Sequence, residues 1–182
     1  MLINVIALGE SASKWDGQGD SIGVNDAFKW EHQLQRLVLL NNPNEFEPER
    51  LDTIRKTQVE AVYTCYREWQ RPGFGLNNVI YFNYNVWQGR LLAKGRDLFQ
   101  TSKTSPFAAI SIAYNLGYDE IVLWGVDFKT HSVWNQKNHN FAYEIKNYQQ
   151  LAEQLKSRGV MVYSSEPSIL KLPVYEKQLI ND

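Results

Sequence analysis

The sequence is poor in cysteine, in long apolar runs and in net charge. Cys65 is the only cysteine among 182 residues, so the chain cannot form an internal disulfide or a metal site built from several cysteines. No apolar run approaches the roughly 20 residues that a membrane-spanning helix needs. The first ten residues, MLINVIALGE, lack the basic leader and the cleavage site of a signal peptide. We therefore expect a soluble, cytoplasmic protein with no membrane span.

The charge is nearly balanced overall but unevenly distributed. Nineteen basic and 20 acidic side chains leave a net charge of −1, which argues against a general polyanion binder, so nucleic acid is not an expected partner. Residues 64–105 carry six basic and two acidic side chains, a local charge of +4, and the remainder carries −5. Most such stretches are solvated surface. We take this one as a minor indication of a phosphate-bearing ligand.

Several ligand-binding motifs are also missing. The chain has neither a G-x-G-x-x-G fingerprint nor a P-loop, which gives no support to a nicotinamide enzyme or an ATP-driven motor. It has no Asp-x-Asp motif, with which many nucleotide-sugar enzymes hold a divalent ion. His131 and His139 are separated by seven residues, and this spacing matches no well-known zinc site. The sequence therefore predicts no metal site and favours a metal-free mechanism, if the protein is an enzyme.

What the chain does contain is apolar and aromatic residues. An apolar content of 43% is enough for a core, and 182 residues predict one domain spanning residues 1–182. The 24 aromatic residues exceed what such a core needs, and several lie in or beside the cationic stretch 64–105. Aromatic rings stack on sugars and bases, so this stretch is where we expect acceptor recognition or a subunit contact in a homo-oligomer. The aromatic residues concerned are Trp69, Tyr81, Phe82, Tyr84 and Trp87.

Apolar runs and helical patterns alternate along the chain. We expect strands at 2–8, 21–24, 36–40, 59–63, 78–85, 120–128 and 160–163, and helices at 46–57, 106–116 and 140–158. The clearest unit is a nearly all-apolar helix with Ser105 as its expected N-cap and Pro106 at its first helical position, followed by Gly117 and a buried strand. This order predicts an α/β fold with a mainly parallel sheet flanked by helices.

Polar and small residues follow several of the predicted strands. In open α/β sheets, ligands bind beyond the carboxyl ends of the strands, where helix N-termini present free N–H groups. The loop that begins at Gly9 is short and consists mainly of small residues, which let a ligand approach the backbone closely, although it also fits an ordinary turn. The candidate binding residues at this edge are Gly9, Ser11, Ser13, Asn25, Thr104, Ser105, Gly125 and Asp127.

Most of these residues also have a simpler interpretation. Asn25 could bond a base or ribose, but Asn25 or Asp26 could equally cap a helix, as could Thr104. Asp127 could bind a hydroxyl or a metal, or cap the following turn. His139 lies in a loop just before a helix, and histidine is a common general base because its ordinary pKa is near neutral; the alternative is a surface or capping histidine.

Three segments carry a resemblance to a known family. ALGESASKW, GVNDAF and TSPFAAISIAYNLGYDEIVLWGVDF together resemble the bacterial sialyltransferase-like group, to which the pterin-pyrophosphokinase-like proteins are related. Residues 117–128 match the strand motif G-[FY]-x-E-I-x-L-x-G-[IV]-D-F of this group, whereas residues 30–100 contain no motif that aligns. The resemblance implies a Rossmann-like domain that binds a nucleotide.

The resemblance also implies roles for single residues. Gly9, Ser11 and Ser13 would lie near the donor phosphate or ribose, Asn25 would contact the nucleotide, and Thr104 and Ser105 its base or sugar. His139 would deprotonate the acceptor hydroxyl, and Tyr143 would stabilise the leaving phosphate in place of a metal. The chain departs from the family at Glu10, where Asn or Ser is usual, and at Pro106, where glycine is expected.

The resulting hypothesis is a metal-independent glycosyltransferase with a nucleotide-sugar donor, for which a CMP-sugar is one candidate, and no required cofactor. The acceptor stays open. One alternative is a diphosphate-transferring enzyme like the pterin pyrophosphokinases, which needs ATP, Mg²⁺ and clustered carboxylates, with Asp26 and Asp127 as the candidates. The other alternative is a non-catalytic nucleotide-binding or assembly protein.

Overall fold

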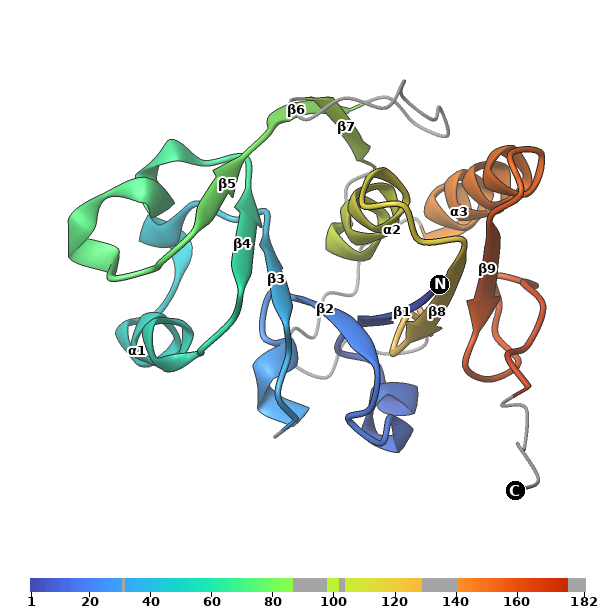
Figure 1. The fold of residues 1–182 in the computed structure, drawn as a ribbon, viewed down its shortest axis with the longest axis horizontal. Helices are drawn as coiled ribbons and strands as arrows, with labels where there is room; N and C mark the ends of the chain where they lie inside the picture. Colours follow the sequence, from blue (N-terminus) through green and yellow to red (C-terminus); the bar gives the residue numbers. More distant parts are fainter. Residues whose placement is uncertain (31, 87–97, 102–103, 129–140, 177–182) are drawn as a thin grey trace.

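A computed structural model of the chain describes residues 1–30, 32–86, 98–101, 104–128 and 141–176. Within these ranges, side chains are described except at 83–86, 98–101 and 141–143. The fold is built around a seven-stranded sheet with the strand order β5-β4-β3-β2-β1-β8-β9 (Figure 1). Every neighbouring pair in this sheet is parallel. The predicted α/β class is therefore confirmed.

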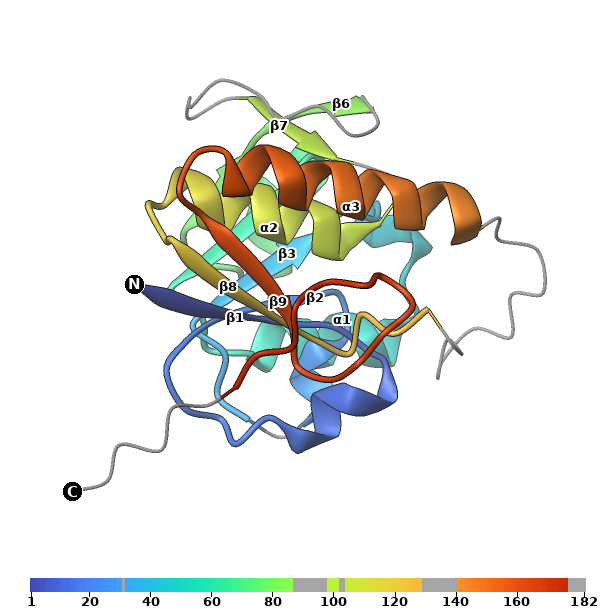
Figure 2. The same cartoon turned by 90° about the vertical axis from the view of Figure 1, so that its right-hand side faces the viewer.

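The strands of the main sheet are short, with three to five residues each. The main sheet comprises β1 (Leu2–Ile6), β2 (Asp20–Val24), β3 (Arg36–Leu39), β4 (Ala61–Thr64), β5 (Val79–Tyr81), β8 (Glu120–Trp124) and β9 (Met161–Ser164). A separate parallel pair is formed by β6 (Asn83–Val86) and β7 (Leu98–Thr101). In Figure 2 the strand β1 runs from left to right, and the helices above it run back in the opposite direction.

Helices cover both faces of the sheet. The α-helices of the described chain are α1 (Pro48–Lys56), α2 (Ser105–Asn115) and α3 (Phe141–Lys156). Short 3₁₀ turns are η1 (Glu10–Lys14), η2 (Ala27–Trp30), η3 (Pro43–Glu45), η4 (Arg67–Gln70) and η5 (Pro72–Phe74). Figures 1 and 2 show α2 and α3 on one face, with α1 on the other.

The two faces of β1 divide the core into two clusters. Ile3 and Val5 pack with α2 and α3, whereas Ile6 packs with α1 and the turn η1. This alternation follows from the two-residue period of a strand. The helix α2 is buried on nearly all sides because its residues are apolar all round, and it ends before Gly117, which adopts a φ of +94°. The fully exposed side of α3 carries the charged residues that the amphipathic pattern predicts.

Three predicted elements need correction. The run 78–85 is not one strand: it divides at Phe82 into β5, which joins the main sheet, and β6, which pairs with β7. The segment predicted as a strand at 120–128 leaves the sheet after Trp124 because Gly125 has a φ of +72°, which a strand does not allow. The strand β7 was not predicted. Alternating β-forming residues indicate a strand but not the sheet to which it belongs.

Candidate functional site

The order of the strands reverses between β1 and β8. From β1 the chain proceeds through β2, β3, β4 and β5 toward one edge, and it later returns to place β8 and β9 on the other side of β1. In open α/β sheets, ligands bind beside such a reversal, near the loops that follow the two central strands. Here those loops are η1 after β1 and residues 125–128 after β8.

Gly9 and Gly125 bring these two loops into contact. The N–H of Gly9 donates to the carbonyl of Gly125 at 2.8 Å. A Cβ on Gly9 would lie 2.5 Å from Asp127 Oδ2, and one on Gly125 would lie 2.8 Å from the nitrogen of Gly9. Glycine at both positions is thus required by the approach of one loop to the other. Ligand binding by these glycines stays a prediction.

Ser11 and Asp127 join the same loops through side chains. Asp127 accepts from the Ser11 N–H at 3.1 Å through Oδ2 and from the Ser11 hydroxyl at 2.6 Å through Oδ1. The Ser11 hydroxyl in turn accepts from the N–H of Gly125 at 2.8 Å, and Ser11 is only 3% exposed. Ser13 is exposed, and its hydroxyl donates to the carbonyl of Glu10. Ser11 and Asp127 therefore hold the loop after β1 against the loop after β8, whereas Ser13 is open to solvent.

Asn25 and Ser105 meet at the same edge of the sheet. Asn25 follows β2 with a φ of +48°, a conformation that asparagine tolerates, and its N–H donates to the carbonyl of Val38. Its Nδ2 donates to the hydroxyl of Ser105 at 3.1 Å. Its Oδ1 is buried and, among the described residues, is the one buried side-chain polar atom with no hydrogen-bond partner. A buried acceptor of this kind is costly unless something else fills its hydrogen bond.

The start of α2 differs from the expected capping pattern. Thr104, not Ser105, is the N-cap residue, and its side chain makes no capping bond to the helix. Instead the Thr104 hydroxyl lies 2.7 Å from the hydroxyl of Tyr148 in α3. Serine and threonine at this position usually accept from a first-turn N–H. Both hydroxyls are used in tertiary contacts here, which is why the local prediction for Ser105 is wrong.

Asp26 is held in a buried ion pair. The carboxylate is 1% exposed and accepts from Arg50 twice, from Nε at 3.0 Å and from the guanidinium NH2 group at 2.7 Å. The same guanidinium lies 4.3 Å from the centre of the Phe46 ring. No sequence signal links Asp26 to an arginine 24 positions away. With Asp127 bonded to Ser11, both carboxylates that the diphosphate-transfer alternative requires have protein partners.

No cluster of three or more histidine, cysteine or acidic side chains that could hold a metal ion occurs within the described residues. His139 and His131 lie outside those residues, and for Tyr143 the structure describes only the backbone at the start of α3. The roles of His139 as general base and of Tyr143 as phosphate-stabilising group are therefore still predictions.

Buried polar residues of α3 were missed by the sequence analysis. Glu144 is 7% exposed and Asn147 is 3% exposed, and the Asn147 amide donates to Glu144 Oε2 at 3.5 Å. They adjoin the buried Tyr148, whose pKa burial raises above its ordinary value. The signal was present, because Glu144 and Asn147 are three residues apart and each directly precedes a residue of the apolar stripe, Ile145 and Tyr148.

The aromatic residues of the middle third divide between core and surface. Trp69 and Phe82 are 1% and 0% exposed and belong to the two core clusters. Tyr81 is half-buried, with the guanidinium of Arg67 located 4.2 Å from its ring centre. Trp69 and Phe82 therefore account for part of the aromatic excess by packing. They are not available for an acceptor.

Comparison with known proteins was made at the level of sequence and of structure. No protein-family model and no curated protein sequence matches the chain. Solved structures do match. The sialyltransferase CstII from Campylobacter jejuni, in complex with the substrate analogue CMP-3FNeuAc, superposes with a TM-score of 0.57 at 14% identity, covering 96% of this chain and 85% of that one. The chain has the fold of this sialyltransferase.

Two further structures agree with this likeness. An alpha-2,3-sialyltransferase from Campylobacter jejuni in apo form gives a TM-score of 0.56 at 17% identity and covers 96% of this chain and 80% of that one. CstII in complex with a trisaccharide acceptor and CMP gives a TM-score of 0.52 at 16% identity, with coverages of 90% and 80%. The family resemblance noted from the sequence motifs is thus confirmed for the fold.

None of the helices in the described part of the chain has the length and apolar character that a membrane span requires.

Proposed function

We propose that the protein is a glycosyltransferase that transfers a sugar from a nucleotide donor without a metal ion. The donor would lie at the carboxyl edge of the sheet, across the ends of β1, β2 and β8. The observation that carries the proposal is the buried Asn25 Oδ1, which lacks a hydrogen-bond partner in the described chain and adjoins Ser105 at the start of α2. A bound nucleotide-sugar would satisfy this acceptor with one of its N–H or O–H groups.

The fold supports the nucleotide part of the proposal. Its structural relatives include sialyltransferases bound to CMP or to a CMP-sugar analogue, one of them also holding a trisaccharide acceptor. The strand order reverses between β1 and β8, and α/β folds commonly bind nucleotides beside such a reversal. We therefore take a CMP-sugar as the first donor to test and a sugar hydroxyl as the first acceptor.

The proposed reaction is a direct displacement at the anomeric carbon. His139 would take the proton of the acceptor hydroxyl as the acceptor oxygen bonds to the anomeric carbon. The bond from that carbon to the phosphate oxygen would break, and the nucleotide would leave with the electron pair, inverting the configuration. Tyr143 would stabilise the leaving phosphate by donating a hydrogen bond. No required cofactor is proposed.

The contacts of the two candidate carboxylates disfavour the diphosphate-transfer alternative. Asp26 is paired with Arg50, and Asp127 accepts two hydrogen bonds from Ser11. Asp26 is 1% exposed as well as paired, and Ser11 already occupies two of the acceptor sites of Asp127, so neither carboxylate is freely open to Mg²⁺. A non-catalytic nucleotide-binding protein with the same fold is the alternative that the experiments below distinguish.

A thermal-shift screen tests nucleotide binding. CMP, UDP, GDP, ADP and their sugars are added separately, and a ligand at a hundred times its dissociation constant should stabilise the protein by about 2.7 kcal/mol. Asn25→Gly keeps the positive φ accessible and removes the amide, so it should abolish most of the shift. Asn78→Gly is the matched control, because Asn78 also has a positive φ of +53° and lies before β5. The absence of any shift in the unmodified protein would refute the proposal.

A transfer assay tests the role of His139. His139→Ala should reduce sugar transfer to background while the thermal shift with the donor nucleotide is retained, since the base acts only in the chemical step. His131→Ala, the other histidine of the same segment, serves as the control and should leave transfer unchanged. Nucleotide binding without any transfer by the unmodified protein, over a panel of sugar acceptors, would favour the non-catalytic alternative.

A further inference from the structure

The Tyr148 side chain connects α3 to two segments of the candidate site. Its hydroxyl lies 2.7 Å from that of Thr104, the residue from which α2 begins. Its ring packs edge-on against Phe107 in the first turn of α2, with the centroids 5.5 Å apart, and against Phe128, with the centroids 5.4 Å apart. Phe128 directly follows Asp127 and has a φ of +51°. One side chain thus contacts the start of α2 and the loop after β8.

The hydroxyl of Tyr148 is not explained by packing alone. The residue is 1% exposed on the apolar stripe of α3, where phenylalanine would fill nearly the same volume without a polar atom to bury. Burial raises the pKa of Tyr148, the hydrogen bond with Thr104 offsets this in part, and Glu144 adds to the rise. The phenol is therefore protonated at neutral pH and can donate to Thr104.

The contact also changes what Thr104 does. A threonine at an N-cap normally accepts a hydrogen bond from an N–H in the first turn of its helix. Thr104 makes no such bond, and its hydroxyl meets Tyr148 instead. The side chain that would have covered the first turn of α2 is thereby turned toward α3. Ser105, the next residue, then holds the amide of Asn25.

We infer that Tyr148 is a positioning residue of the proposed nucleotide-sugar site, which fixes Thr104 and the first turn of α2 against Asn25. This inference rests on the proposed function, because it assigns Tyr148 a role in ligand binding and not only in folding. Tyr148 itself acts through Thr104 and the two phenylalanines. Its hydroxyl orients Thr104 through their hydrogen bond, and its ring packs against Phe107 and Phe128.

The test separates the hydroxyl from the ring. Tyr148→Phe keeps the contacts with Phe107 and Phe128 and removes the hydroxyl. The dissociation constant for CMP, or for whichever nucleotide the unmodified protein binds, is measured at a temperature where every variant is folded. We expect it to rise roughly three- to tenfold, the size of one neutral hydrogen bond. In a Thr104→Val background, Tyr148→Phe should cause no further rise, since the pair is already broken.

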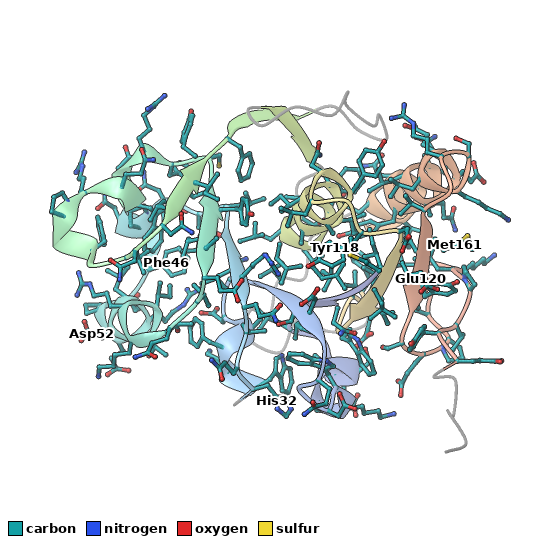
Figure 3. The ribbon with its side chains drawn as sticks, viewed as in Figure 1. His32, Phe46, Asp52, Tyr118, Glu120 and Met161 are labelled. Carbon is teal, nitrogen blue, oxygen red and sulfur yellow. The ribbon has the colours of Figure 1, made fainter. Side chains whose placement is uncertain are left out.

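Tyr118→Phe is the matched control. Tyr118 is also a buried tyrosine, 7% exposed, whose hydroxyl donates to Asp20 Oδ2 at 2.7 Å. It lies just before β8, which begins at Glu120, and contacts the first residue of β2, so it is at the opposite end of the strands from the candidate site (Figure 3). Removing its hydroxyl should lower the melting temperature and leave the dissociation constant unchanged. Equal effects of the two substitutions on binding would overturn the inference.

Amide hydrogen exchange on the ligand-free protein keeps the outcomes distinct. Tyr148→Phe should speed exchange in the first turn of α2 at least severalfold, whereas Tyr118→Phe should not. If the unmodified protein binds nucleotide but neither binding nor exchange responds to Tyr148→Phe, the inference is wrong and the proposed function stands. If the unmodified protein binds no nucleotide, the proposed function is wrong, and so is the assignment of Tyr148 to its site; accelerated exchange would then indicate a structural contact only.

Discussion

At the residue scale, Gly125 shows how closely the two central loops approach each other. Its φ of +72° resembles the +79° of Gly159, which ends α3, but the surroundings differ. A Cβ on Gly125 would lie 2.8 Å from Ala12 Cβ, whereas one on Gly159 would meet nothing within 4 Å. Comparing Gly125 with Gly159 therefore separates the energetic cost of a left-handed side-chain-bearing residue from the cost of a steric clash with Ala12.

We expect Gly125→Ala to destabilise the protein by about 2–5 kcal/mol, combining a left-handed residue with overpacking. Gly159→Ala should cost only the first part, about 1–2 kcal/mol. Urea unfolding of both variants measures the difference. Equal losses would mean that the two loops separate without cost and that the close approach is not important for stability.

At the scale of elements, Ser11 joins η1 to the segment that follows β8. Ser11→Ala removes the hydroxyl that donates to Asp127 Oδ1 and leaves the buried N–H of Gly125 without its acceptor. An unsatisfied buried group costs about 1–3 kcal/mol, and we expect a loss of stability in that range. Ser13→Ala, in the same turn but exposed, should change the free energy of unfolding by less than about 0.5 kcal/mol. Chemical denaturation of the two variants provides the comparison, and a larger effect at Ser13 would contradict the assigned contacts.

At the scale of the whole molecule, buried phenols and the single thiol make stability sensitive to alkaline pH. Burial raises the pKa values of Tyr63, Tyr118 and Tyr148, and it raises that of Cys65 to about 11. In the unfolded chain these groups ionise from about pH 9 upward, so the folded state then binds more protons. Their contribution is complete below pH 9 and is lost as the pH rises toward the folded-state values.

The free energy of unfolding should therefore fall above pH 9, by up to about 1.4 kcal/mol per pH unit for each group that ionises only in the unfolded chain. Urea titrations at pH 8 and pH 10.5 measure this loss. Tyr148→Phe removes one such group and should show a smaller decrease than the unmodified protein. A decrease of the same size in the variant would show that Tyr148 ionises equally in both states.

Some of these features were predictable because their signals are local. Pro106 in the first turn, an all-apolar run and Gly117 were sufficient to predict α2, and the strand motif in residues 117–128 indicated the fold that the sialyltransferase structures confirm. The Asp26–Arg50 pair and the division at Phe82 were not predictable in this way. They depend on which elements become neighbours, and alternation or helical spacing does not contain that information.

The sequence by itself determined the three α-helices, most strands of the main sheet, and the small and polar residues that follow those strands. Periodicity, proline and glycine act within a few residues, so these features can be inferred from short windows. Only the tertiary structure decided that the strand order reverses beside β1 and that Ser11 meets Asp127 across 116 positions. It also decided that the Thr104 hydroxyl bonds to Tyr148 and does not cap α2. Hydrogen bonds between distant residues form only after the sheet and its helices have packed, because packing alone brings those side chains within about 3 Å of each other.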